Sequence, residues 1–243
     1  MDSNAIKIEI CAASPFSAMA AQQGGADRIE LCAALEIGGI TPSFSSIEMC
    51  KKMLDIPVFV LIRPRGGDFC YSESEMQQMI RDIEICHSLG VGGIVSGSLN
   101  SDGSLHIKQL QKLQSACKGM EFTFHRAFDR CNDPFLVAAQ LADLGVDRIL
   151  SSGQQPNALK GASLLARLIE KMEGQIIFMP GSGINVDNIK EINRITGARE
   201  YHFSAKKTQH SPFAFKNDMK DKDDYSESDV DLIRSMVNLA KSF

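Results

Sequence analysis

The sequence predicts a single (β/α)₈ barrel, on three observations. Short apolar strands alternate with amphipathic helices along the chain, in eight units without a linker between them. The 243 residues match the usual size of one such barrel, and the 44% hydrophobic content is enough for one large core. The sequence also echoes itself half a chain apart, since Ala26–Leu31 resembles Val146–Leu150 and Ile62–Gly66 resembles Phe178–Ser182. A doubly wound open sheet is the alternative fold, but two matching halves favour closure.

The strands are expected where short apolar runs stop at polar or glycine-containing loops. The run that begins at Val58 is apolar through Ile62, which is typical of a strand buried on both faces of a parallel sheet. In chain order the expected strands are Ile6–Cys11, Ile29–Leu31, Val58–Ile62, Gly93–Ser98, Phe122–His125, Arg148–Ser152, Ile176–Met179 and Glu200–Ser204.

Helices are expected between these strands. Ser72 and Glu75 form the pattern of a capping box ahead of a striped apolar face. Asp133 and Pro134 open another helix in N-cap and first-turn order, and Asn185 is the expected N-cap of a later one. The other expected ranges are Pro15–Gln23, Phe44–Leu54, Ser72–Leu89, His106–Cys117, Ser163–Met172 and Val186–Ile195.

The last unit departs from the pattern. Residues Lys206–Asp224 are polar, charged and interrupted by Pro212, which predicts a long excursion over the mouth of the barrel. A closing helix is expected over residues 226–241, with Ser226 or Ser228 as its N-cap. Residues 1–243 are therefore interpreted as one domain.

Composition excludes several classes of function. The net charge of −4, with no run rich in lysine or arginine, argues against a nucleic-acid binder. No apolar run approaches the roughly 18 residues that cross a bilayer, so no membrane partner is expected. The first residues lack the charged and apolar regions of a signal peptide. Seven scattered cysteines suit reduced thiols, and we expect a cytoplasmic protein.

The alternation of side chains along each strand predicts which ones face the lumen. Ile8 and Ile10 must meet the helices, so their neighbours point inward. The same alternation predicts that a set of polar residues faces the lumen near its mouth, where barrel enzymes carry their active sites. They are Glu9, Glu30, Arg63, His125 and His202, and the first four are the candidate catalytic residues, with shifted pKa values suited to acid–base work. A fully paired ion network that fills the barrel is the alternative.

A second group of residues indicates an anion site. Arg63 and Arg65 end the third strand, beside two glycines whose backbone N–H groups can approach an anion. The loops after strands seven and eight are the usual phosphate-binding place in such barrels. The candidate anion-binding residues are Arg65, Gly181, Gly183, Ser204 and Lys206. Pairing of the arginines with structural carboxylates, and plain tight turns at the glycines, are the alternatives.

Cys11 and Cys32 end adjacent strands and both face inward. Neighbouring strands lie about 4.8 Å apart, so two thiolates there are able to share one small ion. Soft thiolates select Cu(I), whereas structural zinc takes four ligands. Small buried hydrophobes are the commoner use of free cysteine, and spacing alone does not decide between the two.

Four motifs carry a resemblance to a known family: Gly24–Cys32, Ile62–Phe69, Thr123–Asp129 and Ser151–Gln155. These stretches resemble the CutC family of copper homeostasis proteins, and the match runs from strand one through strand eight. The resemblance implies a cytoplasmic TIM barrel, Cu(I) bound by Cys11 and Cys32, and a homodimer, with no organic cofactor. Ser182 departs from the glycine expected there.

Two hypotheses of function follow. The first is a cytoplasmic protein that binds or buffers Cu(I) through Cys11 and Cys32. The second is a barrel enzyme that acts on a small anionic or phosphorylated metabolite, with the carboxylates and His125 as acid–base groups and the cations as its anchor. The resemblance favours copper, while the two arginines and the glycine loops favour a ligand site. Whether the chain is an enzyme stays open at this point.

Overall fold

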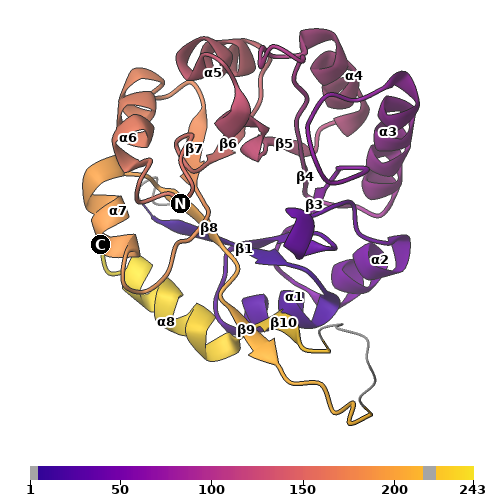
Figure 1. Ribbon diagram of the computed structural model, residues 1–243, viewed down its shortest axis with the longest axis vertical. Helices are drawn as coiled ribbons and strands as arrows, with labels where there is room; N and C mark the ends of the chain where they lie inside the picture. Colours follow the sequence, from indigo (N-terminus) through magenta and orange to yellow (C-terminus); the bar gives the residue numbers. More distant parts are fainter. Residues whose placement is uncertain (1–4, 216–222) are drawn as a thin grey trace.

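A closed parallel barrel surrounded by helices forms the body of the protein (Figure 1). The computed structural model describes residues 5–215 and 223–243. Its main sheet has the strand order β7-β6-β5-β4-β3-β2-β1-β8. The two ends of this order meet, because Gly181, directly after β7, bridges His202 of β8 in parallel. The (β/α)₈ fold predicted from the sequence is confirmed.

The elements follow the predicted order with small shifts at their ends. The barrel strands are β1 Lys7–Ala12, β2 Arg28–Leu31, β3 Val58–Leu61, β4 Gly93–Ser96, β5 Glu121–Phe124, β6 Arg148–Ser151, β7 Ile177–Pro180 and β8 Glu200–Phe203. The helices are α1 Pro15–Gln23, α2 Phe44–Met53, α3 Glu73–Ser88, α4 Ile107–Cys117, α5 Pro134–Asp143, α6 Ala162–Lys171, α7 Ile189–Thr196 and α8 Val230–Ala240. Two short 3₁₀ helices, η1 Leu35–Ile37 and η2 Arg126–Arg130, follow β2 and β5.

Helix starts test the capping predictions. The capping box of α3 is confirmed, since the Ser72 hydroxyl accepts from the Glu75 amide at 3.3 Å and Glu75 accepts from the Ser72 amide at 2.7 Å. The N-cap of α7 is Asn188 and not Asn185, because the Asn188 side chain folds the preceding loop by bonding Asn185 N and Gly183 O. Asp229 caps α8 in place of Ser226 or Ser228, which belong to a strand.

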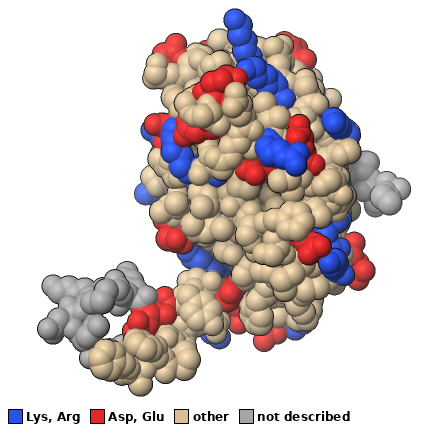
Figure 2. Space-filling model, turned by 90° about the vertical axis from the view of Figure 1, so that its right-hand side faces the viewer, with Lys and Arg blue, Asp and Glu red and all other residues tan. Residues whose placement is uncertain are grey.

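The described part of the segment after β8 forms an arm that starts at the C-terminal ends of the barrel strands. Strand β9 (Lys206–Gln209) pairs antiparallel with β10 (Tyr225–Ser228), and Figure 1 shows this pair extending outward beside α1. Glu227 holds the base of the arm, because it accepts hydrogen bonds from Ser14 and Ser17 at the start of α1. Figure 2 shows the arm projecting from the body at the lower left. The predicted excursion also includes residues 216–222, which lie outside the described residues.

Hydrophobic residues form two separate clusters, and their membership confirms the inward and outward faces predicted for the strands. The large cluster lies between sheet and helices and includes Ile8, Ile10, Ile29 and Leu31. The small cluster fills the lumen with Cys11, Cys32, Phe59, Leu61 and Val95. No helix in the described parts of the chain is both long and apolar enough to cross a membrane.

Candidate functional site

A cavity of about 400 Å³ opens at the C-terminal ends of the barrel strands. Because parallel strands all end on the same side, their inward side chains and the loops that follow them meet here. The loop that carries η1 contributes Leu35, Gly38 and Gly39. Of the residues predicted for a site, the cavity is lined by Cys11, Glu30, Cys32, Arg63, His125, Gly183, His202, Ser204 and Lys206.

Two thiols form one wall of the cavity. The Sγ atoms of Cys11 and Cys32 lie 3.8 Å apart, and both residues are buried. Cys11 pairs in register with Glu30 on the neighbouring strand, and the Cys32 amide donates to the Ala12 carbonyl at 2.9 Å. The parallel pairing of β1 and β2 therefore holds the two thiols side by side, as the sequence predicted.

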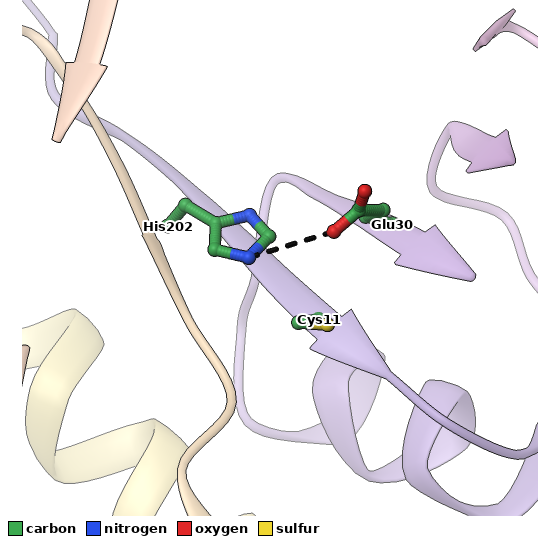
Figure 3. A group of neighbouring side chains, drawn as sticks. All are labelled: Cys11, Glu30 and His202. Atoms are coloured by element: carbon green, nitrogen blue, oxygen red, sulfur yellow. Dashed lines mark ion pairs between the residues drawn. The ribbon is translucent and has the colours of Figure 1, made fainter. Parts of the chain in front are cut away.

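An imidazole and a carboxylate complete this wall. Single ligand atoms of Cys11, Glu30 and His202 all lie within 4.8 Å of one another, and Figure 3 shows the three side chains converging from β1, β2 and β8. The Nε2 atom of His202 is 3.5 Å from Glu30 Oε2. Sulfur, nitrogen and oxygen donors are thus gathered in one place. A metal bonded at about 2.3 Å to both sulfurs spans up to about 4.6 Å between them, so 3.8 Å fits a bent pair of thiolate ligands.

Glu9 lies one layer deeper and does not line the cavity. Its side chain is fully buried, accepts from Arg28 Nε at 2.5 Å, and contacts His202 Nδ1 at 2.7 Å. Burial acts to raise the pKa of Glu9, but the charge of Arg28 and the hydrogen bond with His202 outweigh it and lower that pKa to about 2. Glu9 is therefore an ionised group that orients His202 from below.

The pKa values of Glu30 and Cys11 are shifted in the opposite direction, upward. Burial raises the pKa of Glu30 to about 7, and the charge of Glu9 adds to the shift while His202 opposes it. The pKa of Cys11 is raised well above its usual value by the hydrogen bond with Cys32, by burial, and by Glu30 and Glu9. Burial opposes the charge on His202, yet the Glu9 hydrogen bond and the two carboxylates raise its pKa. Without a metal the Cys11 thiol is protonated at neutral pH, and Glu30, with its pKa near 7, exchanges a proton in that range.

Arg63 and His125 form a second wall. The Arg63 guanidinium donates to the carbonyls of Ile37, Gly39 and Gly67 at 3.2, 2.8 and 3.0 Å. His125 Nδ1 accepts from the Ala127 amide at 3.3 Å. Burial and the charge of Arg63 lower the pKa of His125 to about 3, so this imidazole is neutral and its Nε2 carries the hydrogen.

Two residues predicted for the anion site are elsewhere. Arg65 is bonded to Glu75 at 2.5 Å and to Asp68 at 3.1 Å, so it holds the loop after β3 together outside the cavity. Gly181 closes the barrel beneath the mouth, where an added Cβ would lie 2.4 Å from Leu150 Cδ1. At Arg65 the structural alternative, a carboxylate partner, holds, whereas Gly181 serves close packing against Leu150 and not the tight turn named as its alternative.

Several lining residues were not singled out from the sequence. Phe69 stacks on Arg63, with the guanidinium 5.0 Å from its ring centre, and its ring centroid lies 4.7 Å from that of His125. Gly38 and Gly39 both have positive φ, and a Cβ on Gly39 would lie 2.7 Å from Leu61. The doubled glycine was the available signal, because such a pair allows a carbonyl to approach a buried side chain closely.

The fold and the cavity together define a (β/α)₈ barrel with a candidate site at the mouth, the end where such barrels carry their sites. Comparison with known families narrows this class. Residues 6–207 match the model of the CutC family, and the chain belongs to that family.

Individual relatives agree with this assignment. The chain is 47% identical over 212 residues to a CutC family protein of Parabacteroides distasonis, which covers 87% of each chain. It is 44% identical to the human copper homeostasis protein cutC homolog, over 88% of this chain and 78% of the human one. A solved structure of a CutC from Streptococcus agalactiae superimposes with a TM-score of 0.79 at 31% identity, over 82% of this chain and 98% of that one. These names support a general role in copper homeostasis.

Proposed function

We propose that this protein binds Cu(I) through the thiolates of Cys11 and Cys32. The 3.8 Å separation of the two Sγ atoms in a buried wall of the cavity is the observation that carries the proposal. Soft sulfur ligands select Cu(I), and a pair of them suits an ion that needs few ligands. Binding releases the two thiol protons, so affinity falls as the pH falls.

An anaerobic titration with Cu(I) against a competing chelator tests this proposal. Cys11→Ser combined with Cys32→Ser should abolish the tight site, whereas Cys70→Ser, at an exposed cysteine away from the cavity, should keep it. Thiols are counted before each titration, because an oxidised pair would mimic the loss. Tight binding retained in the double variant would exclude the thiolate site.

Zinc is the matched comparison, since zinc sites commonly use four ligands and accept nitrogen and oxygen donors. Glu30 and His202 supply these donors beside the thiols. Removing both with Glu30→Gln and His202→Phe should weaken Zn(II) binding by at least tenfold and change Cu(I) binding much less. Equal losses for both ions would mean that the copper site uses more than the two sulfurs.

The second candidate function is a barrel enzyme acting on a small anionic or phosphorylated metabolite. The observation that favours it is the contrast between Glu9 and Glu30 on the two sides of His202, with one pKa near 2 and the other near 7. Such a split provides one fixed charge and one exchangeable proton, as acid–base catalysis requires. Proton NMR of metabolite mixtures incubated with the metal-free protein would reveal turnover, and Glu30→Gln should abolish it. Turnover that persists in this variant would exclude Glu30 as the acid or base.

We also propose a reducing compartment, the cytoplasm, and a homodimer. Free cysteines throughout the described residues support the compartment. Exposed aromatic side chains, among them Phe16, Phe44, Phe213 and Phe215, support self-association. Sedimentation at micromolar concentration should give a mass near twice 26.6 kDa, and a single-chain mass would contradict the dimer.

A further inference from the structure

Arg63 differs from the other arginines of the barrel lumen. Arg28 contacts Glu9 and Glu200, each at 2.5 Å, and Arg148 contacts Glu200 and Glu121 at 3.0 and 2.7 Å. Arg63 is 5% exposed, yet it has no carboxylate within ion-pair distance among residues 5–215 and 223–243. A buried cation without a counter-charge is costly, so a negative group from outside the chain is expected to balance it.

The hydrogen bonds of Arg63 leave room for such a group. A guanidinium has five N–H donors in a planar fork. Three bonds go to the carbonyls of Ile37, Gly39 and Gly67, and Nε is buried with no well-aligned hydrogen-bond acceptor in the described parts of the chain. Two N–H donors, one on Nε and one on Nη2, therefore have no carbonyl or carboxylate acceptor among the described residues, and the Tyr71 hydroxyl lies near enough to interact with one of them. Two donors on one guanidinium are what a carboxylate or a phosphate accepts in bidentate fashion.

Other unpartnered groups lie close to this arginine. Among the described residues, the buried side-chain atoms without a hydrogen bond are Arg63 Nε, His125 Nε2 and Tyr71 Oη. The charge and the nearby N–H groups of Arg63 already act on Tyr71, where they oppose the rise that burial causes in its pKa, whereas His125 meets only the charge of Arg63, which lowers its pKa. Buried polar atoms are rarely left unpaired, and Arg63 Nε and His125 Nε2 belong to two residues that line the same cavity, which indicates a missing ligand.

The cavity offers space and further donors for that ligand. Its volume of about 400 Å³ is within the usual range for a small-molecule site. Arg63 and His125 line it, as do Cys11, Gly183 and Lys206. Lys206 has no carboxylate partner among the described residues, and the amide of Gly183 donates no hydrogen bond to them. A ligand held at Arg63 therefore has free positive charge and the two thiols within the same cavity.

We propose that Arg63 and His125 bind the carboxylate or phosphate group of a small organic anion, whose remaining part lies in the cavity beside Cys11 and Cys32. Arg63 supplies charge and two N–H donors, and neutral His125 supplies one more from Nε2. This proposal names the ligand class for the second candidate function and does not rest on copper binding. The sequence named both the end of β3 and the loops after β7 and β8 as places for an anion, and the proposal puts its charged group at Arg63, after β3.

Arginine side-chain NMR tests the proposal on the metal-free protein. The Nε–H signal of Arg63, identified by its loss in Arg63→Lys, is followed during separate titrations with inorganic phosphate, malonate and succinate. A saturable shift of this signal is expected with at least one probe. Tighter binding of phosphate assigns a phosphate group to the natural ligand, and tighter binding of a dicarboxylate assigns a carboxylate. No saturable shift with any of the three probes would overturn the proposal.

Variants show where the anion binds. Arg63→Lys keeps the charge but loses the fork, and His125→Phe keeps the ring that packs on Phe69 but loses the Nε2 donor. Each should raise the dissociation constant at least tenfold, as measured by calorimetry. Arg81→Ala, at an exposed arginine on α3, should leave it unchanged. Unchanged binding in both cavity variants would overturn the proposal, and if one fails to fold the other decides.

The cysteine variants separate the two proposals. Cys11→Ser with Cys32→Ser should lose the Cu(I) site and retain phosphate or dicarboxylate binding, because the thiols are not the anion ligands. Anion binding without tight Cu(I) binding in the parent protein would contradict the copper proposal alone. Cu(I) binding without anion binding would contradict the anion proposal alone.

Discussion

The lumen of the barrel has two layers of charged side chains that differ in how their charges are balanced. In the lower layer Arg28 and Arg148 share Glu200, and Glu9 accepts from Arg28, so each buried cation has carboxylate partners. In the layer at the mouth, Arg63 has no carboxylate partner and His125 Nε2 has no hydrogen-bond partner among the residues that the structure describes. Paired charges fill space and fix the register of the strands, whereas unpaired donors beside a cavity are suited to a ligand.

This difference bears on the two interpretations of the inward polar residues, an ion network and a functional site. The interpretation as a satisfied ion network is right for the lower layer, to which Glu9 belongs. The interpretation as a site stays a prediction for the mouth, where Glu30, Arg63 and His125 line the cavity. His202 connects the layers, since its Nδ1 contacts Glu9 at 2.7 Å and its Nε2 is 3.5 Å from Glu30.

The largest expected effect comes from breaking the lower layer. Arg28→Met leaves Glu9 and Glu200 buried with less compensation, which should lower the free energy of unfolding by about 3–5 kcal/mol. Arg63→Met removes a cation that has no carboxylate partner among the described residues. The three carbonyls that lose their hydrogen bonds to Arg63 lie next to a cavity that admits water. Arg63→Met should therefore lower the free energy of unfolding by less, about 1–2 kcal/mol. Urea unfolding measures both, and equal losses would contradict the distinction between the layers.

The two glutamates should give opposite dependences of stability on pH in the metal-free protein. The folded pKa of Glu9 is depressed, so its stabilisation is present above its unfolded pKa near 4.5 and is lost as the pH falls toward 2. The folded pKa of Glu30 is raised, so its stabilisation is present below pH 4.5 and is lost as the pH rises through 7. Each effect is about 3.5 kcal/mol, because each pKa lies about 2.5 from its ordinary value of 4.5 and one pKa unit corresponds to about 1.4 kcal/mol.

Variants at these positions make the contrast measurable. Glu30→Gln should gain stability relative to the parent between pH 5 and pH 8, because it removes a charge that burial disfavours. Glu9→Gln should lose stability relative to the parent over the range from pH 3 to pH 6, because its carboxylate no longer pairs with Arg28. Urea midpoints across these ranges report both slopes. Parallel slopes would show that the two carboxylates share one environment.

The smallest expected effect concerns backbone strain at the mouth. Ser182 lines the cavity with φ of 80°, a conformation that favours glycine, and its hydroxyl donates to the Pro156 carbonyl at 3.2 Å. Ser182→Gly removes the strain but loses the hydrogen bond. It also increases the conformational entropy of the unfolded chain, which opposes folding. We expect Ser182→Gly to raise the free energy of unfolding by up to about 0.5 kcal/mol, as measured by thermal unfolding. A loss above 1 kcal/mol would mean that the hydroxyl matters more than the strain.

The sequence by itself determined the barrel, the order of its elements and the face that each strand turns inward. These depend on local periods: alternation along a strand places Ile8 and Ile10 outside and Cys11 inside, and adjacency of β1 and β2 brings Cys11 next to Cys32. The capping box at Ser72 is similarly complete within four residues. Such short-range contacts can be predicted from the sequence because the interacting groups are neighbours in the chain or on consecutive strands.

Only the tertiary structure decided which charges are paired and which are left for a ligand. Glu9 and His202 are 193 positions apart and meet because the barrel closes between β1 and β8. Arg63 and Arg65 look alike in the sequence, yet one packs on Phe69 at the cavity and the other binds Glu75 outside it. Likewise the base of the polar arm is held against α1 because Glu227 accepts hydrogen bonds from Ser14 and Ser17. Closure fixes the stagger of distant strands, and alternation within one strand carries no information about that stagger.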